Sequence, residues 1–132
     1  MIVDTNVLLR ALDGDTSAHG QAIRKRVETS RATAEKLTVL SATVLEVAYV
    51  LESARAGYGW NRDDIARAVE AIVDDPAFEV EHGEALRNAA TSYRARSVDL
   101  HDCLLSAVAN ERHTRVLSFD EDLRRLGNSE QP

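Results

Sequence analysis

The fold is decided at residues 2–12, which read IVDTNVLLRAL. Ile2–Asp4 predicts a short buried strand, and Asn6–Leu12 predicts a short helix. Asp4 stands where the strand ends, and Thr5 follows it. The chain therefore opens with a strand–helix unit that carries an acid at its junction.

The rest of the chain repeats this unit. Apolar runs predict further strands at residues 37–40, 78–80 and 115–119. Helical periodicity predicts helices at residues 18–29, 43–54, 62–73, 84–96, 100–111 and 122–126. This alternation predicts an α/β fold with a mostly parallel central sheet and helices on both faces. Ligands of such sheets bind beyond the carboxyl ends of the strands.

Length and composition favour one soluble globular domain over residues 1–132. No apolar run approaches the roughly 18 residues that a membrane-spanning helix needs, and no secretion signal is visible. Cys103 is the only cysteine, which suits a reducing cytoplasm. The net charge of −6 means that nucleic acid would need a local basic patch, for which 14 arginines are available. Genome composition explains the arginine content equally well.

Four acids stand among apolar neighbours: Asp4, Glu46, Asp102 and Asp120. An ionised carboxylate is costly to bury unless it is paired, hydrogen-bonded or bound to a metal. Asp4 and Asp120 fall at strand ends, and the other two lie near the ends of neighbouring elements. We therefore expect one pocket that holds a hard divalent cation.

Each acid also has a simpler interpretation. Asp4 and Asp120 can cap the helices that follow them, and Asp99 can cap the helix that contains Asp102. Glu46 can be a partly buried acid paired with an arginine. The local sequence leaves these alternatives open.

Other kinds of site have little support. The four histidines show no metal-binding motif, so a zinc site is not expected. There is no glycine-rich phosphate loop and no arrangement of serine, histidine and acid for acyl transfer. A site made only of oxygen ligands favours Mg²⁺ or Mn²⁺.

Four motifs in order resemble those of PIN-domain nucleases, specifically the VapC-type toxins of bacterial toxin–antitoxin pairs. They are DTN at residues 4–6, SATVLE at residues 41–46, VDLHDCLLSAVA at residues 98–109 and VLSFDEDL at residues 116–123. No single motif is specific, but their order and spacing match along nearly the whole chain. Ser118 stands where threonine is common in the family, and it keeps the hydroxyl.

The resemblance implies a three-layer PIN-like fold and an endoribonuclease that uses Mg²⁺ or Mn²⁺. It implies that Asp4, Glu46, Asp102 and Asp120 form the catalytic, metal-binding set. Asn6, Ser118 and Asp99 are then supporting residues, the first two orienting the site. The resemblance also implies a homodimer, a cognate antitoxin and an RNA substrate that the sequence does not name.

Two other classes are weighed against this one. A Mg²⁺-dependent phosphatase or receiver domain shares the α/β pattern, but neither Lys25 nor Lys36 follows a late strand as those families require. A PIN-like module that binds RNA without cutting it is expected to lack one of the four acids. The basic and aromatic loop at residues 55–62 is a candidate RNA contact, although Trp60 can instead pack between helices or in a dimer.

Overall fold

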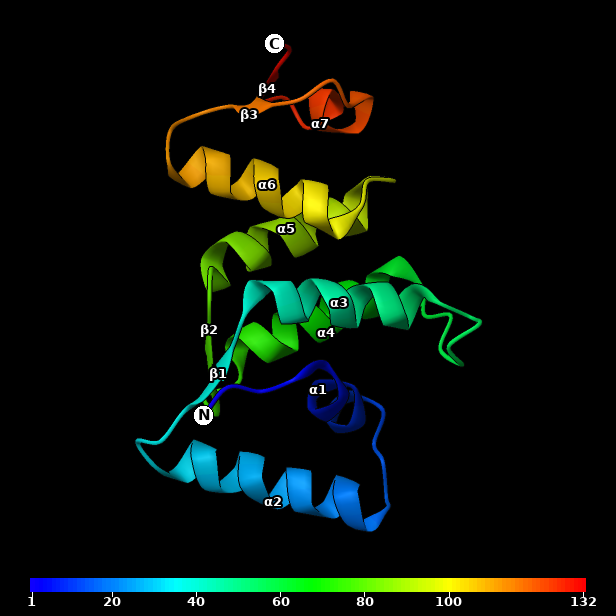
Figure 1. Cartoon of the computed structure of the whole chain (residues 1–132), viewed down its shortest axis with the longest axis vertical. Coiled ribbons are helices and arrows are strands. Elements are labelled where there is room, and N and C mark those ends of the chain that lie inside the picture. Colours follow the sequence, from blue (N-terminus) through cyan, green and yellow to red (C-terminus); the bar gives the residue numbers. More distant parts are fainter.

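The computed structural model describes residues 1–132 as seven helices and four short strands. In chain order the elements are α1 (Thr5–Leu12), α2 (Ala18–Ala32), β1 (Leu37–Val39), α3 (Ser41–Glu52), α4 (Arg62–Asp74), β2 (Phe78–Val80), α5 (Gly83–Ala95), α6 (Leu100–Glu111), β3 (Val116–Leu117), α7 (Glu121–Arg125) and β4 (Ser129–Glu130). The chain forms an elongated stack, with α2 at one end and β3, α7 and β4 at the other (Figure 1). The expected α/β class is confirmed.

The strands form two separate pairs, and both pairs are parallel. β1 pairs with β2 in the register Leu37 to Phe78, and β3 pairs with β4. The expected first strand is reduced to a single bridge between Ile2 and Thr38. Ile2 is 66% exposed, so the prediction that it is buried is wrong. β4 was not expected, because its two residues carry no alternating pattern.

Helix α4 shows how local sequence sets an element's limits. Asn61 caps the helix by accepting a hydrogen bond of 2.8 Å from the backbone N–H of Asp64. Ile65, Val69 and Ile72 recur at helical spacing and are all buried. The amphipathic helix predicted here is therefore confirmed, and it begins with Arg62.

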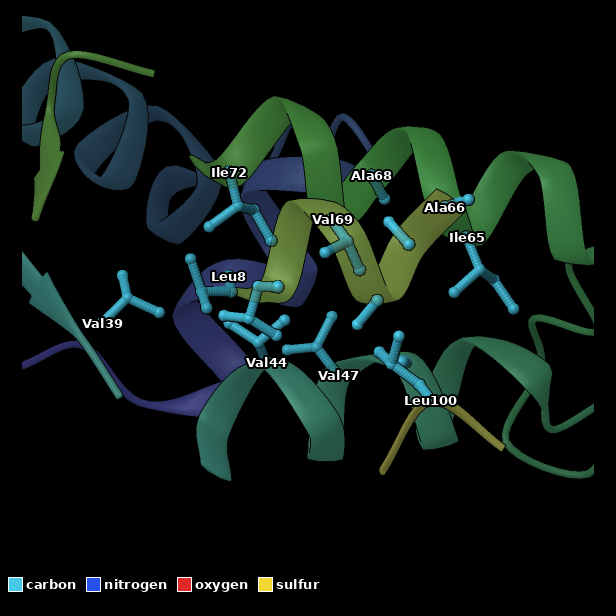
Figure 2. Close-up of a cluster of buried hydrophobic side chains, with 14 of the residues drawn as sticks. Leu8, Val39, Val44, Val47, Ile65, Ala66, Ala68, Val69, Ile72 and Leu100 are labelled. Carbon is cyan, nitrogen blue, oxygen red and sulfur yellow. The ribbon is translucent and has the colours of Figure 1, made fainter. Parts of the chain in front are cut away.

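One cluster of 26 buried residues forms the core. Leu8 of α1, Val44 and Val47 of α3 and the apolar face of α4 meet in it (Figure 2). No residue of 112–132 belongs to this cluster, but Leu126 packs against it. We call residues 112–132 the C-terminal segment. Apolar packing of Leu126 and polar contacts with α6 together hold this segment in place.

Several large apolar side chains remain on the surface. Ile2, Leu117 and Phe119 are 66%, 69% and 75% exposed, and they lie at or beside strands that pair on one side only. None of the helices combines the length and the apolar character needed to cross a membrane.

Candidate metal centre

Three aspartates meet where α6 faces the C-terminal segment. Asp102, Asp120 and Asp122 each offer a carboxylate oxygen, and these atoms all lie within 4.8 Å of one another. Asp102 and Asp122 are half-buried, and Asp120 is exposed. No other group of three or more acidic, histidine or cysteine side chains comes this close together.

The start of α6 carries the first of these acids. Asp99 is the N-cap residue, and its backbone carbonyl accepts a hydrogen bond of 3.0 Å from the N–H of Cys103. Asp102 lies in the first helical turn, and the neighbouring Leu100 and Cys103 are buried. The Asp99 side chain makes no capping hydrogen bond, so the position predicted for the cap is correct but the side-chain bond is absent. The position of the Asp102 carboxylate is thus fixed by α6, because the next residue of that helix, Cys103, is buried in the core.

The other two acids lie at the start of α7. Asp120 is the N-cap, and its Oδ1 accepts a hydrogen bond of 2.8 Å from the N–H of Asp122. The Ser118 hydroxyl oxygen accepts a hydrogen bond of 2.9 Å from the N–H of Asp120. Asp120 therefore caps α7, as one of the two interpretations predicted, and it also belongs to the acidic group. Ser118 orients the backbone that carries this acid.

Polar contacts hold the C-terminal segment against α6. The amide nitrogen of Asn128 donates to the carbonyl of Ser106 at 2.9 Å and to Oδ1 of Asn110 at 3.0 Å. The Ser106 hydroxyl donates back to Oδ1 of Asn128 at 2.8 Å. Arg96 donates to the carbonyl of Arg125 at 3.2 Å, beyond the end of α5. These bonds set the distance between Asp102 and the two acids of α7.

The electrostatics of this group are unfavourable without a cation. Burial raises the pKa of Asp102 above its ordinary value, and the charges of Asp120 and Asp99 raise it further. No protein group donates a hydrogen bond to the Asp102 carboxylate, whereas Asp122 forms an ion pair with Arg125. The uncompensated acid is therefore Asp102.

Asp4 and Glu46 are connected through Thr5, and we call them the second group of acids. Oδ1 of Asp4 accepts a hydrogen bond of 3.0 Å from the N–H of Val7, so the capping interpretation of Asp4 is confirmed. The hydroxyl of Thr5 donates to Oε2 of Glu46 at 2.7 Å, which joins α1 to α3. Glu46 has no arginine partner, so that alternative is wrong. Both carboxylates are exposed, and Asp120 is exposed as well, so these three acids are not in buried positions as their apolar neighbours suggested.

The structure thus brings Asp102 and Asp120 together and links Glu46 to Thr5, the residue after Asp4, but it does not gather all four acids within ligand distance of one another. Asp122 was not expected as a ligand. The sequence signal for Asp122 is its position two residues after Asp120 at the start of a helix. The side chain of an N-cap residue bonds to the backbone of the first turn, which brings these two residues close together. Ser41 of the SATVLE motif donates to Glu81 at 2.7 Å and not to Glu46.

Asn6 and the loop at residues 55–62 share an open hollow. Asn6 lines it together with Tyr58 and Trp60. Trp60 is half-buried against the core and meets the Tyr58 ring edge-on at 6.4 Å between ring centroids. Trp60 thus packs partly against the core, and the predicted RNA contact of this loop stays a prediction. Arg62, at the end of this loop, directs its guanidinium into the protein, as described below.

The donors of the Asp102 group fit a divalent cation. All of them are carboxylate oxygens, which Mg²⁺ and Mn²⁺ prefer, and one is half-buried with no protein donor. Asp102, Asp120 and Asp122 are the residues that can hold such an ion directly.

Comparisons with known proteins show the family to which the chain belongs. The PIN domain family model matches residues 1–128. The VapC ribonuclease of Aquifex aeolicus (strain VF5) is 35% identical over 127 residues, an alignment that covers 96% of this chain and 91% of that protein. The chain belongs to the PIN domain family. The resemblance inferred from the four motifs is confirmed.

Proposed function

We propose that this protein is a metal-dependent endoribonuclease that hydrolyses RNA phosphodiester bonds and acts as the toxin of a toxin–antitoxin pair. The observation that carries the proposal is the 35% sequence identity, over 96% of this chain, to a protein named as a VapC ribonuclease. The acidic group at Asp102 supports it, since three clustered carboxylates are the ligands that a hard cation prefers. We expect the reaction to take place in the cytoplasm.

The proposed site uses both groups of acids. Asp102 and Asp120, with Asp122, would hold Mg²⁺ or Mn²⁺, and Ser118 and Asp99 would hold the segments that carry them. When bound, such an ion would supply positive charge that polarises a phosphoryl oxygen and neutralises the leaving oxygen. Thr5 holds Oε2 of Glu46 at 2.7 Å, which leaves Oε1 free to accept a proton from water. Asp4 and Asn6 complete the side of the site that α1 provides.

A finer description of the fold is part of the proposal. We propose that the edge at Ile2 and the edge at β3 join in one mostly parallel central sheet, which gives three layers over residues 1–132. Both edges expose apolar side chains, at 66% for Ile2 and 69% for Leu117. Asp4 and Asp120 each follow one of these edges, so joining them brings the two groups of acids together.

A cross-linking experiment tests this sheet. If the two edges are adjacent, cysteines that replace Ile2 and Leu117 should be joined within one chain by a short bismaleimide. Cys103 is buried, so it does not compete for the reagent. Each single cysteine variant serves as the control. If mass spectrometry finds no intramolecular cross-link, the two edges stay apart and the single-sheet proposal is wrong.

The activity is tested directly with RNA. Purified protein should cut RNA in Mg²⁺ or Mn²⁺, and excess EDTA should stop it. Sequencing the 5′ ends of RNAs cut after induction in cells then identifies the substrate. Binding of RNA without cleavage would favour the inactive RNA-binding module, and hydrolysis of phosphomonoesters alone would favour the phosphatase class.

The proposed partners are a second copy of the chain and an antitoxin. Because Asp102 lacks a protein partner, a cationic side chain fits beside it, and arginine makes bidentate contacts with carboxylates. We expect the antitoxin to place an Arg or Lys near Asp4 and Asp102. Replacing both acids with Asn should speed dissociation of the complex, and unchanged kinetics would show that the antitoxin binds elsewhere.

A further inference from the structure

Arg62 joins three parts of the chain through its guanidinium. Its Nε donates to the carbonyl of Tyr93 at 2.9 Å, and its Nη2 donates to the carbonyl of Arg96 at 2.8 Å and to that of Val98. The guanidinium carbon lies 3.8 Å from the centre of the Tyr93 ring. One side chain of α4 therefore binds three backbone carbonyls that lie between the last turn of α5 and the start of α6.

These carbonyls control where α6 begins. Tyr93 lies in the last turn of α5, where carbonyls have no partner within the helix, and Arg96 is the C-cap residue. Val98 comes immediately before Asp99, the N-cap of α6. The connection between α5 and α6 is thus tied at both ends to the first residue of α4.

The residues that the Arg62 guanidinium contacts are largely buried. Tyr93 is fully buried, and its hydroxyl donates to the Glu52 carboxylate at the end of α3. Val98 is 2% exposed. A guanidinium held between a buried ring and three carbonyls has little freedom, so it transmits the position of α3 and α4 to the start of α6.

We infer that Arg62 is a positioning residue for the proposed metal centre, since it fixes the turn from which Asp99 and Asp102 extend. The inference rests on the proposed function. The guanidinium of Arg62 bonds to the backbone of residues 93–98 and to none of the proposed ligands, so it acts through that backbone. Displacement of a reacting group by about 1 Å can lower a rate by about 100-fold, so a loosened turn affects catalysis directly.

The chemistry of arginine is essential to this role. Two nitrogens of the planar guanidinium donate in a fixed fork, while its face stacks on Tyr93. A lysine at this position keeps the charge but is a single point donor. Arg62→Lys should therefore restore only part of what Arg62→Met removes.

The experiment compares these two variants with wild type and with Arg31→Met. Arg31 is a matched control, because it makes a bidentate pair with Asp75 at 2.9 and 2.6 Å and contacts none of the proposed ligands. Three quantities are measured: Mn²⁺ affinity by calorimetry, hydrogen exchange of residues 97–105 in EDTA, and kcat and KM for RNA cleavage. All are compared at a temperature where each variant is folded by circular dichroism.

Arg62→Met should weaken Mn²⁺ binding by about 10-fold and lower kcat by about 10- to 100-fold, with KM changed less than about twofold. Exchange at Cys103 and Leu104 should speed up. Arg31→Met should melt lower but keep its Mn²⁺ affinity and kcat. If Arg62→Met does not fold, Arg62→Lys carries the test, with smaller changes in the same direction.

Normal Mn²⁺ affinity and normal kcat in a folded Arg62 variant would overturn the inference, even if that variant melts lower. This result is distinct from failure of the proposed function. In the latter case wild-type protein itself would not cut RNA, or Asp102→Asn would cut it as wild type does. Inactive Asp102→Asn with fully active Arg62→Met would reject the positioning role alone.

Discussion

The two groups of acids differ in exposure and in the hydrogen bonds that their carboxylates accept. Asp4 and Glu46 are exposed, and each accepts a hydrogen bond from a neighbour, the N–H of Val7 or the hydroxyl of Thr5. Asp102 is half-buried beside two other aspartates, and no protein group donates to it. The carboxylates of the first group are therefore hydrogen-bonded within the protein, whereas the Asp102 carboxylate lies close to two like charges.

The two groups also differ in what holds them. Asp4 caps α1 and Glu46 lies within α3, and these helices reach into the apolar core through Leu8 and Val47. The Asp102 group spans the boundary between this core and the C-terminal segment, which is held there by the hydrogen bonds of Asn128. A site at such a boundary depends on few contacts, so single substitutions should have clear effects.

The largest effect is expected from the acid that lacks a partner. Asp102→Asn should lower kcat for RNA cleavage by about 100- to 1,000-fold, the range for loss of a group that stabilises the transition state. Glu111→Gln is the control, since this exposed acid lies at the other end of α6. Equal rates for the two variants would remove Asp102 from the site.

The next effect comes from breaking the boundary itself. Asn128→Ala removes two donated hydrogen bonds and leaves the Ser106 hydroxyl without its acceptor. We expect a loss of about 1–3 kcal/mol in unfolding free energy and weaker Mn²⁺ binding, because Asp120 is no longer held near Asp102. Urea unfolding and calorimetry measure the two changes. Loss of stability with unchanged Mn²⁺ affinity would show that the acidic group does not depend on this contact.

Much of the fold could be predicted from the sequence, because strongly periodic segments determine their own structure. The helix that begins at Arg62 and the helix at residues 100–111 lie where the pattern of apolar residues placed them. Short strands were harder, since two residues carry no period. Ile2 was expected to be buried because its neighbours are apolar, but its exposure depends on whether another strand lies beside it, which is a property of the whole fold.

The candidate site could be predicted only in part. The pairing of Asp102 with Asp120 follows from family motifs and from strand ends. Asp122 could not be distinguished from a solvated helix start, because its approach to Asp102 depends on Asn128. Arg62 was grouped with a basic and aromatic loop, and nothing local indicates that its guanidinium turns inward to carbonyls more than thirty residues away.

A smaller effect should appear in stability without metal. Asp102→Asn removes a repelled charge, so it should melt about 2–4 °C above wild type in EDTA at neutral pH. The pKa of Asp102 is raised in the folded state, so the charge penalty is present above that pKa and is relieved as the pH falls through it. The difference in Tm should therefore shrink towards pH 4. A variant that melts well below wild type would show that Asp102 is paired with a cation of the protein.

The smallest effect is expected at Asp15, an acid whose pKa is lowered in the folded state, in contrast to that of Asp102. Asp15 accepts hydrogen bonds from the N–H of Ser17 at 2.8 Å and from Arg10 at 2.5 Å, and its pKa is lowered to about 2 by these donors, Ser17 first. Such a group adds stability above its unfolded pKa and loses it as the pH falls towards the folded one. Asp15→Asn should melt slightly below wild type at pH 6, and the gap should close below pH 4. A gap that stays constant with pH would mean that the charge of Asp15 contributes nothing.

The most direct test of the metal centre is a calorimetric titration of metal-free protein with Mn²⁺. Wild type and Glu111→Gln should bind with the same affinity, and Asp102→Asn should bind at least about tenfold more weakly. Asp4→Asn should also bind more weakly if the two groups of acids join in one site. Unchanged Mn²⁺ binding by Asp102→Asn would contradict the assignment of this acidic group as the metal centre.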